Sequence, residues 1–475
     1  MNISHNKSLI LEYKKKKSGW YTHYPINGLW SEEIKNDHFV EILKNFAIKN
    51  KENEKASQLY MHFPFCPKQC LFCHCFTLIT SNKDKYARLV DEIKSEIQLK
   101  HEIYGKKLPI NDIHFGGGSP SVLNFNQVED ILNVIDKVSD QKKWNDVAIE
   151  IDPRNNIEEK TLLDYANAGI NRISFGIQDF DKKVGKSINR IHTLEEMNKL
   201  LSDKVRNNFR SINFDLLFGL PHQTLESLKK TLDTIAILRP TRLAYYSFQH
   251  RPDLYRHQTA INSDHLPNIE TKNAMSLLIQ NKLESLNYIK LGLDHYINKE
   301  DFYYKDLVLN KNIERNAIGY SPETSHNIIG VGPSAMTNID GHYFQNYYTL
   351  PNYTKNISNK LNPIARGWIS NSDDLLRREV IFDIINKGVV DKKKFEKKFK
   401  INFEKYFINE NLQLTQLKKD KLIIEDTNLI KETEIGKELR IYIANAFDVY
   451  KRYKHSKEFF DGKKASDRIY QLKSN

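Results

Sequence analysis

The sequence predicts an α/β fold, specifically a partial or open (β/α) TIM-like barrel, and two observations support this prediction. From Leu59 onward, short apolar runs of strand length alternate with longer stretches of helical periodicity. At least six such units fit into about 230 residues, and alternating strands and helices imply parallel strands. A barrel fits this rhythm better than a doubly wound sheet does.

The expected strands and helices form a repeated strand–helix pattern along the chain. Strands are expected at residues 59–63, 112–115, 147–151, 172–175, 212–218 and 243–248. Helices are expected between or after them at residues 86–103, 125–138, 162–168, 225–238 and 272–286. In a parallel barrel the active site lies at the carboxyl ends of the strands, so we expect catalytic residues there.

The regions outside the barrel differ in composition. Residues 1–58 are polar and lysine-rich around an aromatic stretch at 20–25, and we interpret them as an N-terminal arm. The barrel is assigned to residues 59–349. Helical, lysine-rich sequence then follows, with helices expected at 373–387 and 434–453, so residues 350–475 are predicted to form a small helical C-terminal domain.

Composition excludes several classes of protein. The chain has 475 residues, 40% of them hydrophobic, which excludes a wholly disordered chain. It has no secretory signal and no apolar run long enough to span a membrane, so we expect a cytoplasmic protein. The net charge of +12 is spread over lysine patches that we interpret as solvated faces, and no nucleic-acid-binding signature accompanies it.

All four cysteines lie within ten residues, directly after the first predicted strand. Such clustering indicates metal binding or redox chemistry, because an unsecreted chain of this length needs no disulfide framework. Thiolates at C-x3-C-x2-C spacing, here Cys66, Cys70 and Cys73, can bind three irons of one 4Fe-4S cluster. The fourth iron then takes a non-protein ligand or Cys75. A structural zinc site completed by Cys75 or His74 is the alternative, but four ligands in one tight run give poor tetrahedral geometry.

Three further motifs follow later strands. Residues 116–118 are glycines, which let backbone approach a ligand closely and expose N–H donors, although a plain turn has the same pattern. Glu150 and Asp152 lie at the mouth of the third strand, where a carboxylate can bind ribose hydroxyls or an ammonium; a solvated acid is the competing interpretation for Asp152. Arg190 could bind a carboxylate, or be a surface arginine.

The cysteine motif resembles the signature of the radical S-adenosylmethionine (SAM) superfamily, in which the amino and carboxylate groups of SAM chelate the fourth iron. The extended motif from Tyr60 to Cys75, Y-x-H-x-P-F-C-x3-C-x-F-C-x-C, is similar to that of the oxygen-independent coproporphyrinogen III oxidase family. The likeness runs from about Leu11 to Tyr453. It implies a barrel of the radical SAM type that holds a 4Fe-4S cluster on the first three cysteines.

The resemblance also implies binding residues for one or two SAM molecules. A first SAM is expected near Tyr60, Gly117, Glu150 and Met336, and a second near Phe72, Gly118, Ser119, Gln178, Arg190, Asp215 and Gln249. Gln249 and Met336 depart from a relative that carries Ala and Ile. Cys75, Glu150 and Arg190 are the candidate catalytic residues, with simple packing beside the cluster as the alternative for Cys75. His62, His74 and His295 are expected to be hydrogen-bonded loop residues and not iron ligands.

The implied activity is that of a radical SAM oxidoreductase. Reductive SAM cleavage gives methionine and a 5′-deoxyadenosyl radical, which abstracts hydrogen from a substrate propionate. Loss of CO2 and one electron then leaves a vinyl group, and two such conversions yield protoporphyrinogen IX in haem biosynthesis. A tetrapyrrole-like substrate, an electron donor such as flavodoxin or ferredoxin, and a monomer are expected. A radical SAM methyltransferase or anaerobic haem-modifying enzyme is the alternative, and a haem-binding chaperone the second. Departures at Trp20, Ala317 and Ile318 affect the implied target pocket.

Overall fold

The computed structural model describes residues 3–16, 21–52, 54–322 and 327–450. Its centre is a parallel sheet of strands β1 (Ser57–Phe63), β4 (Ile110–Gly117), β5 (Asp146–Ile151), β6 (Arg172–Gln178), β7 (Ser211–Phe218) and β8 (Arg242–Ser247). Each strand pairs in parallel with the next along the chain. All six predicted strands and their parallel order are therefore confirmed.

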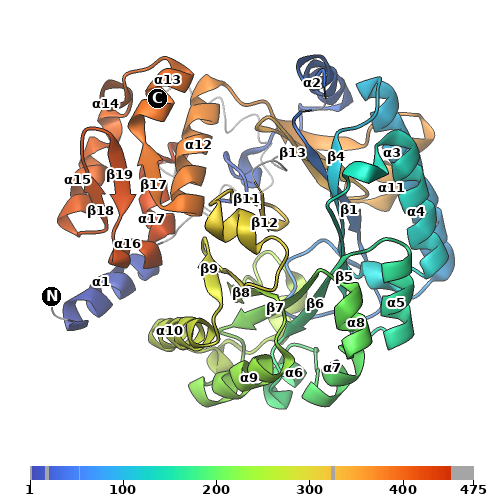
Figure 1. The fold of residues 1–475 in the computed structure, drawn as a ribbon, viewed down its shortest axis with the longest axis horizontal. Helices are drawn as coiled ribbons and strands as arrows, with labels where there is room; N and C mark the ends of the chain where they lie inside the picture. Colours follow the sequence, from blue (N-terminus) through green and yellow to red (C-terminus); the bar gives the residue numbers. More distant parts are fainter. Residues whose placement is uncertain (1–2, 17–20, 53, 323–326, 451–475) are drawn as a thin grey trace.

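Helices cover the outer face of this sheet (Figure 1). They are α3 (Lys83–Tyr104), α4 (Phe125–Val138), α5 (Glu159–Asn167), α6 (Lys182–Ser187), α7 (Leu194–Leu200), α8 (Asp203–Asn208), α9 (Leu225–Leu238) and α10 (Ile269–Ser285). The long helices begin at side-chain caps: the Asn124 carboxamide, for example, accepts from the N–H of Gln127 at 3.0 Å, which satisfies one free donor of the first turn of α4. The five predicted helices are confirmed within a few residues.

The sheet is open and does not close into a barrel. Beyond β1 it continues with β13 (Asn327–Val331), which is parallel to β1, and then with antiparallel β14 (Met336–Ile339), β15 (His342–Asn346) and β16 (Ile364–Trp368). Beyond β8 lie antiparallel β10 (His295–Ile297) and β9 (Ile289–Leu291). Strands β16 and β9 thus end a single sheet of twelve described strands, which confirms the prediction of an open barrel.

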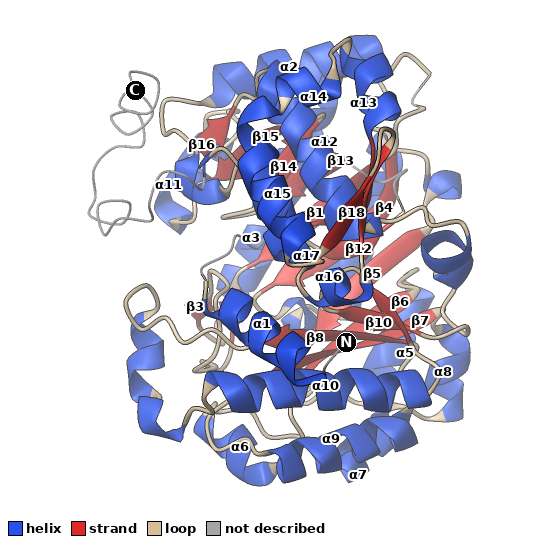
Figure 2. Ribbon diagram, turned by 90° about the vertical axis from the view of Figure 1, so that its left-hand side faces the viewer, coloured by secondary structure: helices blue, strands red, loops and turns tan. Residues whose placement is uncertain are grey.

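The segment predicted to be an N-terminal arm joins two hydrophobic cores. Helix α1 (Ile3–Lys15) lies beside α10 and the C-terminal region (Figure 2), where the Tyr13 hydroxyl donates to Asp420 at 2.6 Å. Helix α2 (Asn36–Lys49) instead buries Phe39, Leu43 and Phe46 in the main core. Trp20 lies outside the described residues. The division of the chain at residues 58 and 349 stays a prediction.

The C-terminal region contains helices and a small sheet. Helices α12 (Ser372–Lys387), α13 (Lys392–Phe399), α14 (Phe403–Tyr406), α15 (Asn411–Lys419), α16 (Glu434–Glu438) and α17 (Arg440–Ala444) surround a core of their own. Antiparallel strands β17 (Val389–Asp391), β18 (Ile423–Glu425) and β19 (Leu429–Glu432) add a three-stranded sheet, which the prediction of a small helical domain did not include. The helix expected at 434–453 is broken at Leu439, and its last three residues lie outside the description.

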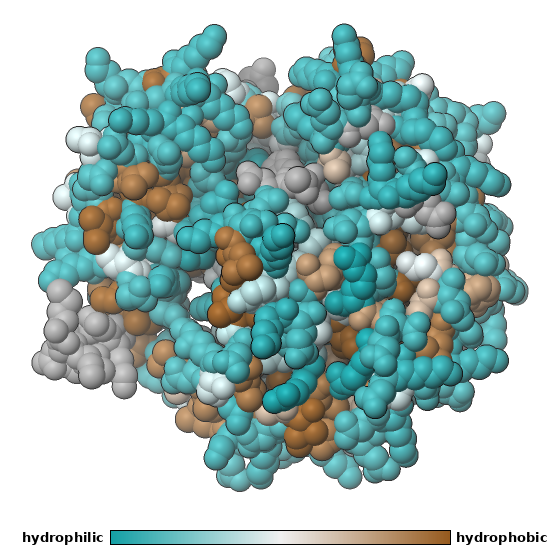
Figure 3. Space-filling model, in the orientation of Figure 1, coloured by the Kyte–Doolittle hydropathy of each residue, from teal (hydrophilic) through white to brown (hydrophobic). Residues whose placement is uncertain are grey.

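The face of the molecule in Figure 3 is mostly hydrophilic, and its apolar patches are small and separated. Among the helices that the structure describes, none combines the length and the apolarity needed to cross a bilayer.

Candidate active site

A cavity of about 350 Å³ lies on the inner face of the parallel sheet. Because successive strand residues point to opposite faces, polar residues at alternate positions of β4 to β8 line it. Most of the predicted site residues also line the cavity: Tyr60, Cys66, Cys70, Phe72, Cys73, Cys75, Gly117, Gly118, Ser119, Glu150, Gln178, Arg190 and Asp215. Gln249 and Met336 do not.

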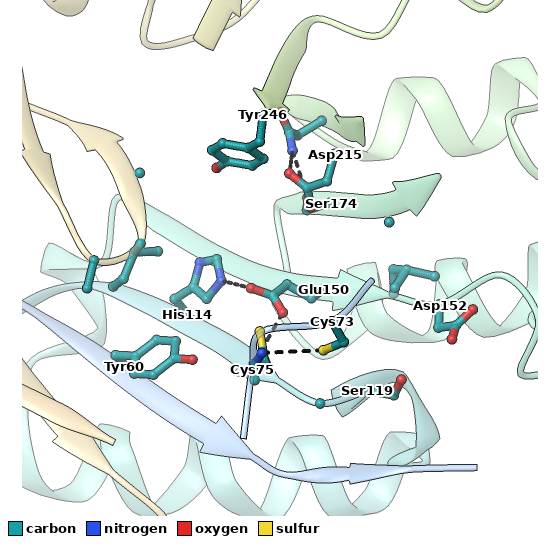
Figure 4. Close-up of a pocket in the computed structure, with 18 of the residues that line it drawn as sticks. Tyr60, Cys73, Cys75, His114, Ser119, Glu150, Asp152, Ser174, Asp215 and Tyr246 are labelled. Atoms are coloured by element: carbon teal, nitrogen blue, oxygen red, sulfur yellow. Dashed lines mark hydrogen bonds and ion pairs between the residues drawn. The ribbon is translucent and has the colours of Figure 1, made fainter. Parts of the chain in front are cut away.

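The four cysteines lie on the loop that follows β1. This loop is closed by the short parallel pair β2 (Phe65–Cys66) and β3 (Leu78–Ile79). Cys70 is buried, Cys66 and Cys73 are half-buried, and Cys75 is exposed to the cavity. The Cys75 thiol and N–H both hydrogen-bond to Cys73, which lowers the pKa of Cys73 and raises that of Cys75 (Figure 4). Burial raises the pKa of Cys66 to about 12, so a metal ion that bound this thiol would have to displace its proton.

Two arginines and one aspartate stand behind Cys70. The guanidinium of Arg154 donates to Cys70 Sγ at 3.0 Å and that of Arg190 at 3.5 Å. Both also donate to Asp152, at 2.6 and 3.2 Å. Burial alone would raise the pKa of Asp152, but the two guanidiniums lower it to about 2. Arg190 is therefore a buried residue with a carboxylate partner inside the chain, and Asp152 is not a solvated acid. Arg154 was not predicted as a site residue.

The glycine loop after β4 packs tightly against the end of β1. A Cβ on Gly117 (φ +108°) would lie 2.9 Å from the His62 ring, and one on Gly118 would lie 2.6 Å from the Pro64 carbonyl carbon. The expected free N–H donors are absent, since the N–H of Gly117 donates to Glu150 Oε2 at 3.2 Å and that of Gly118 to Phe63 O at 2.8 Å. The loop thus serves as a close-packed support for the Glu150 carboxylate and for the cysteine loop.

Glu150 is the central carboxylate of the cavity. Its Oε1 lies 2.9 Å from His114 Nε2. Burial by itself would raise the pKa of Glu150, but His114 and the N–H of Gly117 hold it below the ordinary value. In the view of Figure 4, Glu150 lies between the two cysteines Cys73 and Cys75 and the pair Asp215 and Tyr246. An ionised acceptor at this place suits an ammonium or hydroxyl donor.

Tyr60 and Asp215 are held by hydrogen bonds on either side of Glu150. His62 Nε2 lies 3.0 Å from the carbonyl of Phe76, so this nitrogen carries the proton and Nδ1 accepts from the Tyr60 hydroxyl at 3.2 Å. Asp215 accepts from Ser174 at 2.8 Å and from Asn213 at 2.9 Å. Burial raises the pKa of Asp215, and the charge of Glu150 adds to this effect. The pKa of Glu150 is thus lowered, whereas that of Asp215 is raised.

The wall opposite the cysteines is a hairpin of β11 (Glu314–Asn316) and β12 (Gly319–Ser321). Its tip residues Ala317 and Ile318 line the cavity, together with Tyr246 and His295. The hairpin base is attached to α12: the Arg315 N–H donates to Asn386 at 3.1 Å, and Asn386 donates to Glu314 at 3.0 Å. Residues that depart from the family pattern therefore face the cavity from a wall that the C-terminal region holds in place.

Two predicted residues lie elsewhere. Gln249 is exposed on the segment after β8, where its carbonyl lies 2.9 Å from His74 Nε2. Met336 begins β14 and packs beside Trp30, one strand beyond the β13 residue that pairs with Tyr60. His62, His74 and His295 are each hydrogen-bonded, as expected. Besides Arg154, the sequence analysis missed His114 and Tyr246, which also line the cavity. The signal for His114 was its alternation with Asp112 in an apolar strand.

The residues of the cavity fit a cluster and a nucleotide better than a single ion. Within the described residues, no three His, Cys, Asp or Glu side chains are grouped closely enough to bind one metal ion. A 4Fe-4S cluster places its thiolates on separate irons, and three cysteines of one loop meet that need. Arg154 and Arg190 donate hydrogen bonds to the sulfur of Cys70, and Glu150 and Asp215 offer acceptors on the other side.

These features define a radical SAM protein. A sequence profile of the radical SAM superfamily matches residues 60–235. Such proteins use a 4Fe-4S cluster and SAM, and this chain is accordingly a radical SAM enzyme.

The match to individual relatives extends much further. The oxygen-independent coproporphyrinogen III oxidase of Helicobacter pylori is 32% identical over 436 residues, which is 91% of this chain and 94% of the relative. The enzyme of the same name from Escherichia coli is 31% identical over 91% of this chain and 93% of its own. The solved structure of the coproporphyrinogen III oxidase from Escherichia coli, a radical SAM enzyme, superposes with a TM-score of 0.84 over 91% of this chain and 97% of that one, at 30% identity. The chain belongs to the oxygen-independent coproporphyrinogen III oxidase family.

Proposed function

We propose that this chain converts coproporphyrinogen III into protoporphyrinogen IX by oxidative decarboxylation of two propionate side chains to vinyl groups, a step of haem biosynthesis. One observation carries the proposal: the likeness to the family's enzymes covers 91% of the chain and extends far beyond residues 60–235. It includes the β11–β12 hairpin and the C-terminal region that holds it. The segments that form the walls of the cavity, and not only its radical-generating centre, thus lie within the region of likeness, although Ala317 and Ile318 at the hairpin tip depart from the family pattern.

In this proposal Cys66, Cys70 and Cys73 hold the cluster. When bound, the cluster supplies the electron for reductive cleavage of SAM, and hydrogen abstraction from the substrate follows. Arg154 and Arg190 hold Cys70 by hydrogen bonds to its sulfur, and Asp152 fixes both guanidiniums. Cys75, which is exposed to the cavity and hydrogen-bonded to Cys73, would take part in hydrogen transfer. These roles follow from contacts that exist before any cofactor is bound.

Glu150 and the residues around it would bind SAM. Because the N–H groups of Gly117 and Gly118 are engaged inside the protein, the loop offers a SAM ammonium its acceptors and not its donors. Tyr60 lies on the same side, and we assign Glu150, Gly117 and Tyr60 to the first SAM. The remaining residues of the cavity would contact a second SAM or the substrate: Phe72, Gly118, Ser119, Gln178, Arg190 and Asp215.

The substrate would lie between these residues and the hairpin tip. Most lining side chains are polar or charged, and Ala317 and Ile318 are apolar exceptions. They would contact the macrocycle, while the hairpin keeps water away from the reacting carbon. We also expect an acidic flavodoxin- or ferredoxin-like electron donor and a monomeric enzyme.

The test is a product assay with the anaerobically reconstituted protein. With coproporphyrinogen III, SAM and dithionite we expect CO2 and a divinyl porphyrinogen, and no product from the Cys70→Ala variant. Methylated product with S-adenosylhomocysteine, or a linear tetrapyrrole, would assign the methyltransferase or haem-modifying class instead. Haem binding without SAM turnover would assign the chaperone role.

A further inference from the structure

Three lysines of α6 form an exposed basic face beside the cysteine loop. Lys182, Lys183 and Lys186 are exposed, whereas Val184 and Gly185 between them are buried. In the described part of the chain, no ion pair is formed by any of the three lysines. We call these residues the lysine face.

The lysine face lies next to the cysteines. Ile188, directly after α6, accepts from the N–H of Leu71 at 3.1 Å, and Asn189 donates to the carbonyl of Gln69 at 2.6 Å. The next residue, Arg190, donates to Cys70 Sγ. Gly185 makes this tight path possible, since a Cβ there would lie 2.5 Å from the Arg190 carbonyl oxygen. Only a few residues of continuous, hydrogen-bonded chain thus separate the lysine face from a cluster ligand.

A small hydrophobic core of its own fixes this arrangement. Val184 and Ile188 pack with Leu220, Phe248 and Ile261, and Leu71 and Phe72 of the cysteine loop pack against them. The segment after β8 adds polar contacts: His257 Nε2 lies 2.7 Å from the Cys73 carbonyl, and Gln258 donates to the Phe72 carbonyl at 3.1 Å. The outer surface over the cysteine loop is therefore rigidly placed.

The charge of this outer surface is positive. The cysteine loop, α6 with its cap and the segment at residues 249–266 together carry six cationic side chains against three carboxylates. Two of the carboxylates are already engaged, because Asp181 caps α6 at 2.8 Å and Asp253 pairs with Arg251 at 2.8 Å. The cations are Lys182, Lys183, Lys186 and Arg256, together with Lys68, which also lines the cavity, and Arg251, which is paired with Asp253.

We propose that the lysine face is the docking surface for the electron donor, and that the donor is an acidic one-electron carrier protein. This inference rests on the proposed function only in requiring a cluster on the cysteine loop. A positive patch attracts an acidic partner and orients it, which raises the association rate by one to three orders of magnitude at low ionic strength. The electron would then enter from outside, through the shell of Leu71, Phe72 and Arg190, while substrate occupies the inner face.

The test measures reduction of the cluster itself, without substrate. A photoreduced flavodoxin is mixed with the oxidised holoprotein, and bleaching of the cluster absorbance is followed by stopped flow. For Lys182→Glu/Lys183→Glu/Lys186→Glu we expect a fall of about tenfold or more in the second-order rate at low ionic strength, and a weaker dependence on salt. Glutamine at the same positions should give an intermediate rate.

The matched control reverses three exposed lysines far from the cysteines, Lys393→Glu/Lys397→Glu/Lys405→Glu, on α13 and α14. Figures 1 and 2 place α13 and α6 at opposite ends of the molecule. The control should be reduced at the wild-type rate, and both variants, once prereduced, should cleave SAM normally. Equal rates for the two variants would overturn the docking surface. Loss of SAM cleavage in prereduced wild-type protein would instead overturn the proposed function, and leave the reduction rates to decide the docking surface.

Discussion

Asp152→Asn tests the charge balance behind the cysteine loop. The Asp152 side chain is buried and binds both Arg154 and Arg190. The drop of its pKa from 3.8 to about 2 corresponds to ~2.4 kcal/mol of stability at neutral pH, at roughly 1.36 kcal/mol per pH unit. Asparagine keeps the shape of the side chain but removes this charge, so the unfolding free energy should fall by about that amount.

The pH dependence of the difference identifies its origin. A carboxylate with a lowered pKa in the folded state contributes fully above its unfolded pKa, and this contribution disappears as the pH falls through the folded pKa. The difference between wild type and variant should thus be constant from pH 7 to 5 and fall to roughly half at pH 3. Urea unfolding of the apoprotein, followed by fluorescence, measures it.

The control for this experiment is Asp253→Asn, which breaks an exposed pair with Arg251. Solvent screens this pair, so the urea midpoint should not change. Our account of the site would be refuted by an Asp152→Asn midpoint equal to that of wild type at pH 7. A loss of equal size at pH 7 and pH 3 would refute it as well.

Three further predictions concern the cofactors and the glycine loop. Alanine at Cys66, Cys70 or Cys73 should remove most of the four irons and abolish SAM cleavage, because each thiolate would bind one iron. The Cys75→Ala variant should keep the irons. Iron and sulfide analysis of the four variants measures both results. Glu150→Gln should weaken SAM binding by roughly 10- to 100-fold in equilibrium dialysis, since a charge-assisted hydrogen bond is lost, and unchanged affinity would exclude Glu150 as a SAM ligand. Gly118→Ala should lower the melting temperature and the iron content because its Cβ would meet Pro64, and Gly28→Ala, with open space around it, should do neither.

Much of the fold could be predicted because local and global signals agree. The helix expected at residues 125–138 is found at Phe125–Val138, where an asparagine cap precedes a regular apolar stripe. The sheet of β17, β18 and β19 could not be predicted in the same way, since its strands have only three or four residues and show no clear alternation. Their pairing depends on contacts within the C-terminal core.

The site was predictable where sequence neighbours share a motif. The cysteines and glycines are such neighbours, whereas the contact of His114 with Glu150 joins two strands. The sequence signal for this contact was a polar residue at every second or fourth position of an apolar strand. In one strand these residues are Asp112 and His114, and in the next they are Asp146 and Glu150. All four face the same side of the sheet. Arg154 was equally hidden, as nothing in its sequence context points to a sulfur 84 residues away.

The attachment of the β11–β12 hairpin to α12 bears on how the protein is assembled. The cysteine loop is complete by residue 75, but Asn386, which fixes the opposite wall, is synthesised some three hundred residues later. During translation the cysteine loop is therefore complete long before the hairpin wall of the cavity is held in place. The final third of the polypeptide, which includes the hairpin and α12, then completes the cavity around the cysteine loop.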